Sequence, residues 1–435
     1  MKQITFILAL FVMGLTALRA QEATTGPDYK SLENKLEKSN AAIQDPKKST
    51  NVKTWLDRAK MFESIADVNT GNLRMGMSIN ELKIFYKEPK EIKKFDNGKE
   101  QYIYERMTVS MENNVVKGWS ETQTIVPKPL DDALAAYNKA IELDTDGKNS
   151  GKIVDGLKRL KALYEKKALN SYNQLDYKTA VESFKSILNI NIMKQINVTD
   201  TATIYYTGVA ASEGDMKDEA ITYFKKANDL NYKDPFLFVR LSKLYLIKGD
   251  STEAINTLKK GINIYPDNVS LLVEMINYYI AKAESQNALV AIQKAKVKDP
   301  KNQTFYFVEG VLYDKIGKMD SSVHAYNQAI ELDPNYFDAY YNLGVMYFNN
   351  AVKFIEKANK EVDNTKYLDE KKNADEEFKK AIPFMEKAYE IAKTQKAPEA
   401  QTNQKQSLET LKQLYYRLKM NDQLERVNNL LKELQ

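Results

Sequence analysis

Residues 303–336 read QTFYFVEGVLYDKIGKMDSSVHAYNQAIELDPNY, and they are one unit of a pattern that repeats without a gap from Thr203 to about Asn342. One apolar position of the unit falls at Phe224, Leu258, Ile292 and Tyr326, and the steps 258−224, 292−258 and 326−292 are each 34 residues. Four more columns keep this register: Ala220, Ala254, Ala288 and Ser322; Ala227, Gly261, Ala295 and Ala329; Tyr245, Tyr279, Tyr313 and Tyr347; and Pro266, Pro300 and Pro334. A fixed period of this length is typical of stacked supersecondary units.

The columns predict that each unit is two helices joined by a turn. Small residues recur where two helices must approach closely, and proline closes each unit because it cannot continue a helix. Gly249-Asp250 and Gly317-Lys318 interrupt the middle of their units. In the unit quoted above, the order Gly310, Tyr313, Gly317, Ser322, Tyr326, Ala329, Pro334 resembles the tetratricopeptide repeat. Glu309 and Thr207 depart from that family, which prefers leucine there, and we expect them to weaken packing locally.

This resemblance implies an all-α fold, a right-handed solenoid of helix pairs, with a small α+β domain inserted in the first repeat. We predict a signal peptide over 1–20, a partly ordered lead-in over 21–50, a first pair formed by 51–66 and 131–150, the inserted domain over 67–130, an irregular pair over 151–200, four regular pairs over 201–336, a pair with a helical insertion over 337–395, and a capping pair over 396–435. Pro383 is expected to kink its helix.

The first residues have the pattern of an export signal. Lys2 precedes an apolar run from Ile4 to Leu18, which is shorter than the ~20 residues that span a bilayer. The pattern favours a secretory signal peptide cut after Ala20, and the alternative is an uncleaved anchor. The chain has no cysteine, so it has neither a disulfide nor a cysteine for lipid attachment. We therefore expect an exported, periplasmic product, with no integral membrane segment after cleavage.

The inserted domain has its own signals. Ser78 and Glu81 have the spacing of a capping box that opens a short helix, and Asn97-Gly98 is a hairpin signal. The hairpin signal implies one strand before Asn97, and two more are expected over 100–111 and 115–120, on either side of a turn at Asn113-Asn114. The predicted order is a helix followed by three strands. Residues 73–78, 88–89, 102–104 and 115–119 resemble the small envelope lipoprotein module of the SmpA/OmlA type. In that family the module belongs to the outer-membrane protein assembly machinery. Its lipid-bearing cysteine is absent here, and Lys87-Glu88 stand where it usually has glycine.

Composition and residue types argue against several kinds of chemistry. The formal net charge is +5 and 28% of residues are charged with mixed sign, which suits a solvated helical surface better than a nucleic-acid footprint. The chain has one histidine, His324, and no cysteine. We therefore predict no Cys–His pair, no Ser–His pair and no metal site built from histidines. We predict no catalytic residue, no metal and no cofactor.

A stack of repeats offers a concave face lined by the first helix of each unit. The family geometry places there one row of mostly apolar residues and a second row one turn later: Tyr205, Val239, Val273, Phe307 and Tyr341; then Val209, Lys243, Asn277, Val311 and Val345. Leu246, Ile280 and Phe348 lie close by. Such a groove favours a protein or peptide segment. Only Lys243 and Asn277 fit the family's clamp for a terminal carboxylate, so we predict no clamp. The alternative is that the chain itself covers this stripe.

Three functions follow. The leading prediction is a non-enzymatic scaffold or adaptor that binds another envelope protein in the groove, with the inserted domain as a second docking surface. The first alternative is a holdase-type chaperone for exported polypeptides. The second is a hydrolase with its site in the inserted domain, where Asp96 and Tyr102 are the best candidates. The sequence identifies neither the partner nor the oligomeric state.

Overall fold

The computed structural model describes residues 28–396 and 398–434. This part of the chain is mostly helical and contains one small antiparallel sheet near its start, which confirms the predicted fold class. Contacts divide it into two compact units, the first ending at Lys233 and the second beginning at Asp234. None of the described helices is long and apolar enough to cross a bilayer. The predicted signal peptide lies outside the described residues.

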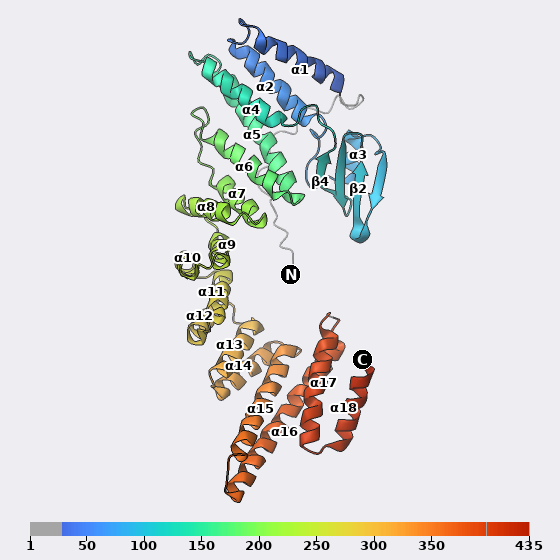
Figure 1. Cartoon of the computed structure of the whole chain (residues 1–435), viewed down its shortest axis with the longest axis vertical. Helices are drawn as coiled ribbons and strands as arrows, with labels where there is room; N and C mark the ends of the chain where they lie inside the picture. Colours follow the sequence, from blue (N-terminus) through green and yellow to red (C-terminus); the bar gives the residue numbers. More distant parts are fainter. Residues whose placement is uncertain (1–27, 397, 435) are drawn as a thin grey trace. The chain divides into compact units, whose positions relative to one another are not determined.

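From residue 28 onward, the first unit contains seven long helices and the inserted domain. The helices are α1 (Tyr29–Gln44), α2 (Val52–Asp67), α4 (Pro129–Leu143), α5 (Ser150–Asn173), α6 (Tyr177–Asn191), α7 (Thr201–Glu213) and α8 (Lys217–Asp229). Helices α2 and α4 lie side by side although residues 68–128 separate them in the chain (Figure 1). The buried Tyr137 hydroxyl of α4 donates to Glu63 Oε1 of α2 at 2.5 Å, and Arg159 Nε of α5 donates to Glu63 Oε2 at 3.1 Å. One helix pair is therefore interrupted between its two members. Helix α1, which packs on α2, occupies much of the lead-in.

The inserted domain is helix α3 (Ile79–Phe85) packed on a four-stranded sheet. The strands are β1 (Glu91–Lys94), β2 (Lys99–Ile103), β3 (Met107–Glu112) and β4 (Val115–Glu121), antiparallel in the order β1-β2-β3-β4, with a 3-10 turn η1 (Asp96–Gly98) between the first two. The domain has its own core, made of Leu73, Met77, Leu82, Tyr102, Met107, Val109, Met111, Val116 and Trp119. An insertion with a separate core can stay folded without burying its apolar side chains against the repeats.

The sheet of the inserted domain has one strand more than the three predicted from the sequence. The strand expected over 100–111 is two strands, because the chain turns at 104–106, where Tyr104 N donates to Met107 O at 2.8 Å. No glycine or proline marks that turn. The strand expected before Asn97-Gly98 is present as β1, but its bounds could not be predicted because its sequence, EIKK, is exposed along its whole length and has no apolar alternation. The capping box of Ser78 and Glu81 is present. The turn at Asn113 and Asn114 has φ values of +53° and +63°, as a two-residue hairpin turn requires.

The inserted domain is fastened to helix α5 by polar contacts. The Asn170 side chain accepts from Trp119 N at 2.9 Å and donates to Trp119 O at 2.8 Å. The amide therefore makes the two hydrogen bonds that a neighbouring strand would make with Trp119 of β4. Lys166 Nζ donates to Asp67 Oδ1 at 3.1 Å and to Thr70 O at 2.5 Å. A Cβ at Gly118 would lie 1.7 Å from Gln174 Nε2, so only glycine permits this approach without movement of Gln174.

The second unit consists of helix pairs throughout its described residues. Its helices are α9 (Pro235–Ile247), α10 (Ser251–Ile264), α11 (Val269–Ala281), α12 (Ser285–Lys298), α13 (Gln303–Lys315), α14 (Met319–Leu332), α15 (Phe337–Ala358), α16 (Asn364–Thr394), α17 (Ala400–Arg417) and α18 (Asn421–Glu433). The apolar column is buried: Leu258, Ile292 and Tyr326 are at most 2% exposed. A Cβ at Gly310 would lie 2.6 Å from the Tyr326 ring, which explains why small residues recur opposite large ones.

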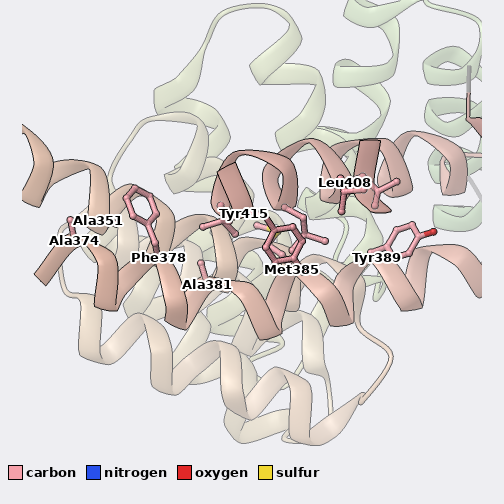
Figure 2. Close-up of a cluster of buried hydrophobic side chains, with 11 residues drawn as sticks. Ala351, Ala374, Phe378, Ala381, Met385, Tyr389, Leu408 and Tyr415 are labelled. Atoms are coloured by element: carbon pink, nitrogen blue, oxygen red, sulfur yellow. The ribbon is translucent and has the colours of Figure 1, made fainter. Parts of the chain in front are cut away.

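The helical insertion of the second unit lengthens a pair and adds no separate domain. Helices α15 and α16 run beside each other, and α16 continues through Pro383. Their shared core extends into α17 and α18 and is made of Ala351, Ala374, Phe378, Ala381, Met385, Tyr389, Leu408, Leu411, Leu414, Tyr415 and Val427 (Figure 2). This insertion is stabilised by the same core as the C-terminal helix pair.

Candidate partner-binding surface

The starts of the first helices are fixed by a column of capping residues that the sequence analysis did not use. Asp200, Asp234, Asn268 and Asn302 are spaced by 34 residues (234−200, 268−234 and 302−268), and each side chain accepts from a backbone N–H in the first turn of α7, α9, α11 or α13. An N-cap satisfies a backbone donor that has no partner inside the helix. Equivalent caps start each helix at the same point of the 34-residue unit, so corresponding residues occupy the same position in each helix.

The ten residues predicted to line the groove have three kinds of environment. Tyr205, Val209 and Val239 are buried, with exposed fractions of 1%, 8% and 7%. Half-buried residues are Val273, Phe307, Tyr341 and Val345. Lys243, Asn277 and Val311 are exposed. Tyr205 and Val209 belong to the first unit and the other eight to the second.

Burial of Tyr205 has a clear local cause. Its ring stacks on Tyr232 at a centroid distance of 4.6 Å and lies against Phe224 at 5.6 Å, so its area is used inside its own repeat. Phe307 likewise packs on Tyr326 and Tyr336. A side chain that is 1% exposed offers almost no area to a partner. The accessible part of the predicted row therefore lies in the second unit.

Three apolar side chains on consecutive first helices of the second unit are exposed. Leu246 on α9, Ile280 on α11 and Val311 on α13 are 38%, 37% and 37% exposed, and we call these three residues the first-helix row. On two of the same helices, Lys243 Nζ lies 2.6 Å from Glu274 Oε1, so this ion pair bridges α9 and α11. The row offers apolar contact area with a neutralised charged pair beside it.

The two departures from the repeat pattern are buried and satisfied. Glu309 is 4% exposed, and its carboxylate accepts from Lys296 Nζ at 2.7 Å and Gln293 Nε2 at 2.5 Å across α12 and α13. The Lys296 ammonium also lies 4.1 Å from the Tyr306 ring centroid. Thr207 donates to Thr203 O at 2.7 Å. A buried carboxylate that is paired and hydrogen-bonded avoids the penalty of an isolated charge, and the Glu309 contacts link α12 to α13.

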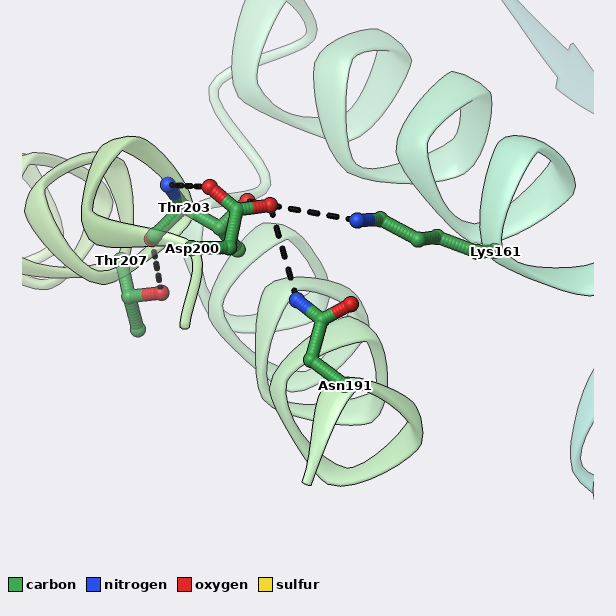
Figure 3. Close-up of polar contacts among 5 residues, drawn as sticks. All are labelled: Lys161, Asn191, Asp200, Thr203 and Thr207. Atoms are coloured by element: carbon green, nitrogen blue, oxygen red, sulfur yellow. Dashed lines mark hydrogen bonds and ion pairs between the residues drawn. The ribbon is translucent and has the colours of Figure 1, made fainter. Parts of the chain in front are cut away.

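A polar cluster joins α5, α6 and α7 around Asp200 (Figure 3). Asp200 Oδ1 accepts from Thr203 N at 3.0 Å, while Oδ2 accepts from Thr203 Oγ1 at 2.8 Å and Lys161 Nζ at 3.2 Å, and Asn191 Nδ2 lies 3.5 Å away. Burial alone would raise the pKa of Asp200, but these hydrogen bonds and the Lys161 charge hold it below its usual range. The cluster closes the loop over 192–200, which replaces the regular short connection between pairs.

Within the described residues, the groups considered for catalysis or metal binding lie apart from one another. His324 is exposed on α14, and the described residues contain no cluster of three histidine, cysteine or carboxylate side chains able to hold a metal. In the inserted domain, Asp96 lies in the turn after β1, whereas Tyr102 is 5% exposed in β2. The Tyr102 hydroxyl donates to Glu100 Oε2 at 3.1 Å. Burial is the main cause that raises the pKa of Tyr102, and the Glu100 carboxylate raises it further. A raised phenol pKa makes this tyrosine a poor base at neutral pH.

Comparisons with known families support the repeat assignment. A family model described as TPR repeat matches residues 310–350, and one described as tetratricopeptide repeat matches residues 237–268. The chain contains tetratricopeptide repeats. Both matched segments lie in the second unit, where the 34-residue columns are complete. No curated protein matches the chain.

Solved structures with a similar arrangement include two proteins. A MamA structure, from residue 41 to the end of the protein of Desulfovibrio magneticus RS-1, is 18% identical with a TM-score of 0.34, and the match covers 46% of this chain and 99% of that one. Another MamA structure is 23% identical with a TM-score of 0.34, covering 45% and 96%. YrrB, described as a TPR protein with an unusual peptide-binding site, is 17% identical with a TM-score of 0.33, covering 47% and 95%.

Proposed function

We propose that this chain is an exported, non-enzymatic adaptor that binds a segment of another cell-envelope protein along the first helices of its second unit. The observation that carries the proposal is the first-helix row, in which Leu246, Ile280 and Val311 expose apolar area on three consecutive repeats. Exposed apolar positions on successive first helices fit an extended or helical segment better than they fit a small molecule. YrrB, a repeat protein with a peptide-binding site, is a precedent in kind for this use of the repeats.

Export to the periplasm is part of the proposal and rests on the pattern of residues 1–20 alone. If the signal peptide is cleaved as predicted, the mature protein begins at Gln21. N-terminal sequencing of the protein recovered from the periplasmic fraction tests this directly. Recovery of the intact first residues in the membrane fraction would support the uncleaved anchor instead.

The proposed role of the inserted domain is a second docking surface. Its likeness to the SmpA/OmlA module rests on the residues quoted from the sequence, and it suggests a place in outer-membrane or envelope assembly. The matched family segments, 237–268 and 310–350, lie outside this domain. A domain that is fastened at Trp119 and Asn170 would present any bound partner at a fixed place on the first unit.

Site-specific photocrosslinking tests the adaptor function. A crosslinking amino acid is placed at Leu246, Ile280 or Val311 in cells that make the protein, and at Val290 and Val297 of α12 as controls. The control positions are 53% and 76% exposed and equally apolar, so they report nonspecific stickiness. The expected result is one identified protein attached at the row positions and absent at the controls.

Binding of the purified partner then completes the test. Ile280→Asp is expected to weaken binding by about tenfold or more, since a charge would be placed against apolar area, while Val297→Asp leaves it unchanged. Crosslinks only within the same chain would support the alternative that the stripe is covered. Attachment of many unrelated exported chains would favour the holdase, and equal attachment at the controls would overturn the proposed surface.

A further inference from the structure

The two edges of the inserted sheet are treated differently by the rest of the chain. The β4 edge is closed: Val116 exchanges backbone hydrogen bonds with Gly76 and Met77, at 2.9 and 2.8 Å, and Trp119 pairs with the Asn170 amide. The opposite edge is β1, and all four of its residues are exposed. An exposed edge strand presents backbone groups that can pair with another extended chain.

The register identifies which backbone groups of β1 are available. Glu91 lies opposite Ile103 and Ile92 opposite Tyr102, and this register continues to Phe95, whose N–H donates to Lys99 O at 2.8 Å. Hydrogen-bonded and non-hydrogen-bonded pairs alternate along an antiparallel ladder. Phe95 and Lys93 therefore bond to β2, and the N–H and C=O groups of Ile92 and Lys94 point away from the sheet. At the start of the strand, Lys90 N donates to Ile103 O at 2.7 Å.

The side chains around this edge define the chemistry of a matching strand. Ile92 is 42% exposed and lies opposite the buried Tyr102, so it stands on the face that α3 covers. Between Lys87 and Lys94 there are four lysines and two glutamates, a net charge of 4−2 = +2. The ion pairs Lys93–Glu91 (4.0 Å) and Lys94–Glu100 (3.5 Å) are long and exposed, so they hold these lysines weakly.

We propose that β1 is a docking edge for an extended acidic segment of a protein partner, which adds to the sheet as a fifth strand. Main-chain hydrogen bonds to Ile92 and Lys94 supply pairing, and the lysines select acidic sequences and repel basic ones. This inference deepens the proposed adaptor function by assigning the second docking surface and its class of ligand. It does not use the first-helix row.

The experiment uses the full mature chain and two short fluorescent peptides of equal length, one alternating Glu with Val and one alternating Lys with Val. The acidic peptide is expected to bind at least about tenfold more tightly at low salt, and its affinity falls as salt screens the lysines. Amide hydrogen exchange supplies the specific readout. Binding should slow exchange at Ile92 and Lys94 and leave Lys93 unchanged, because its N–H already bonds to β2.

Paired variants separate backbone pairing from side-chain contact. Ile92→Pro removes an outward N–H without removing a β1–β2 hydrogen bond, so binding should fall by about tenfold or more. Ile92→Thr keeps the N–H and should stay within about threefold of the parent. The double variant Lys93→Glu, Lys94→Glu should reverse the preference, toward the basic peptide, and it keeps the test decisive if the proline variant unfolds.

Two outcomes would overturn the docking edge. One is equal affinity for the two peptides, and the other is binding that leaves exchange at Ile92 and Lys94 unchanged. In either case the lysines of β1 serve only to keep the edge from pairing, as charged side chains on edge strands commonly do. Crosslinks at Leu246, Ile280 and Val311 are read separately, so failure at β1 and failure of the proposed adaptor function give different results.

Discussion

The two insertions in this repeat protein differ in how their buried residues are packed. Residues 68–128 interrupt a helix pair of the first unit and form a domain whose nine-residue core is its own. The helical insertion of the second unit lengthens α15 and α16, and its buried residues belong to a core shared with α17 and α18. The first insertion is attached to the repeats mainly by polar contacts, those of Trp119 with Asn170 and of Asp67 with Lys166, which we call the seam. The second is attached by continuous apolar packing.

The difference has consequences for cooperativity. A domain with a separate core can lose its structure while the neighbouring helix pairs remain folded, because few buried apolar contacts cross the seam. In repeat arrays, stability is carried by each unit and its nearest neighbours. We therefore expect damage inside the first insertion to stay local, and damage inside the second to spread to the end of the chain.

The largest effect is expected from Ala381→Asp in the shared core. Ala381 is 0% exposed, and an unpaired carboxylate there should destabilise the second unit by about 4 kcal/mol or more. Limited proteolysis and circular dichroism should show loss of α15 to α18 together. Lys379→Asp, at an exposed position of the same helix, is the matched control and should change little. Proteolysis confined to the tip between α15 and α16 would show that the core is not shared.

A comparable change in the first insertion should stay inside it. Val109, in the centre of β3, is 0% exposed, so Val109→Asp should unfold the inserted domain at a cost of about 4 kcal/mol. In a Trp55→Phe background the fluorescence of Trp119 reports this domain alone, and it should shift to the value of a solvated indole while most helical signal persists. Ser120→Asp, exposed on β4, is the control. Simultaneous loss of the helical signal would contradict an independent core.

The sequence predicted the repeats well because their signal is redundant. Each column is repeated, and Leu258, Ile292 and Tyr326 are buried at the same position of successive units. The inserted sheet was harder to predict, since β1 has no apolar alternation and the turn at 104–106 contains neither glycine nor proline. The cap column at Asp200, Asp234, Asn268 and Asn302 was visible in the sequence at the same spacing and could have been used.

The candidate site was predicted less well than the fold, for a physical reason. Family geometry tells which way a side chain points, but exposure depends on what else packs there. Tyr205 is buried because Tyr232 stacks on it, whereas Val311, in the other row, remains exposed. Glu309 shows the same limit: its burial is possible only because Lys296 and Gln293 reach it from another helix. Single-sequence patterns do not contain these partners.

The seam of the first insertion should respond to a single amide. Asn170→Ala leaves Trp119 N–H and C=O without the bonds they make now, at a cost of about 2 kcal/mol to the attachment of the inserted domain. Hydrogen exchange at Trp119 should accelerate, while the Trp119 fluorescence of the folded core stays native. Asn173→Ala removes an amide that donates to Leu169 O within the same helix, and should leave the seam intact. Equal effects of the two variants would mean that the amide does not hold the domain.

The smallest expected effect concerns the loop over 192–200. This loop is longer than the regular connection between helix pairs but too short to have a core of its own. Asp200→Ala removes both a helix cap and the ion pair with Lys161, whereas Asp250→Ala removes only a cap of the same geometry, with an N–H to carboxylate distance of 3.0 Å in both. We expect losses of about 2 and about 1 kcal/mol, measured by denaturant unfolding at neutral pH.

The pH dependence of Asp200 separates its ion pair and hydrogen bonds from simple loop ordering. Since its pKa is lower in the folded chain than the ordinary 3.8, its stabilisation is fully present above that value and is lost as the pH falls through the folded-state pKa. The difference between Asp200→Ala and the parent should therefore be constant from neutral to mildly acidic solution and shrink only in strong acid. A difference that already disappears in mild acid would mean that folding does not lower the pKa of the Asp200 carboxylate, so that its ion pair and hydrogen bonds contribute little to the junction of α5, α6 and α7.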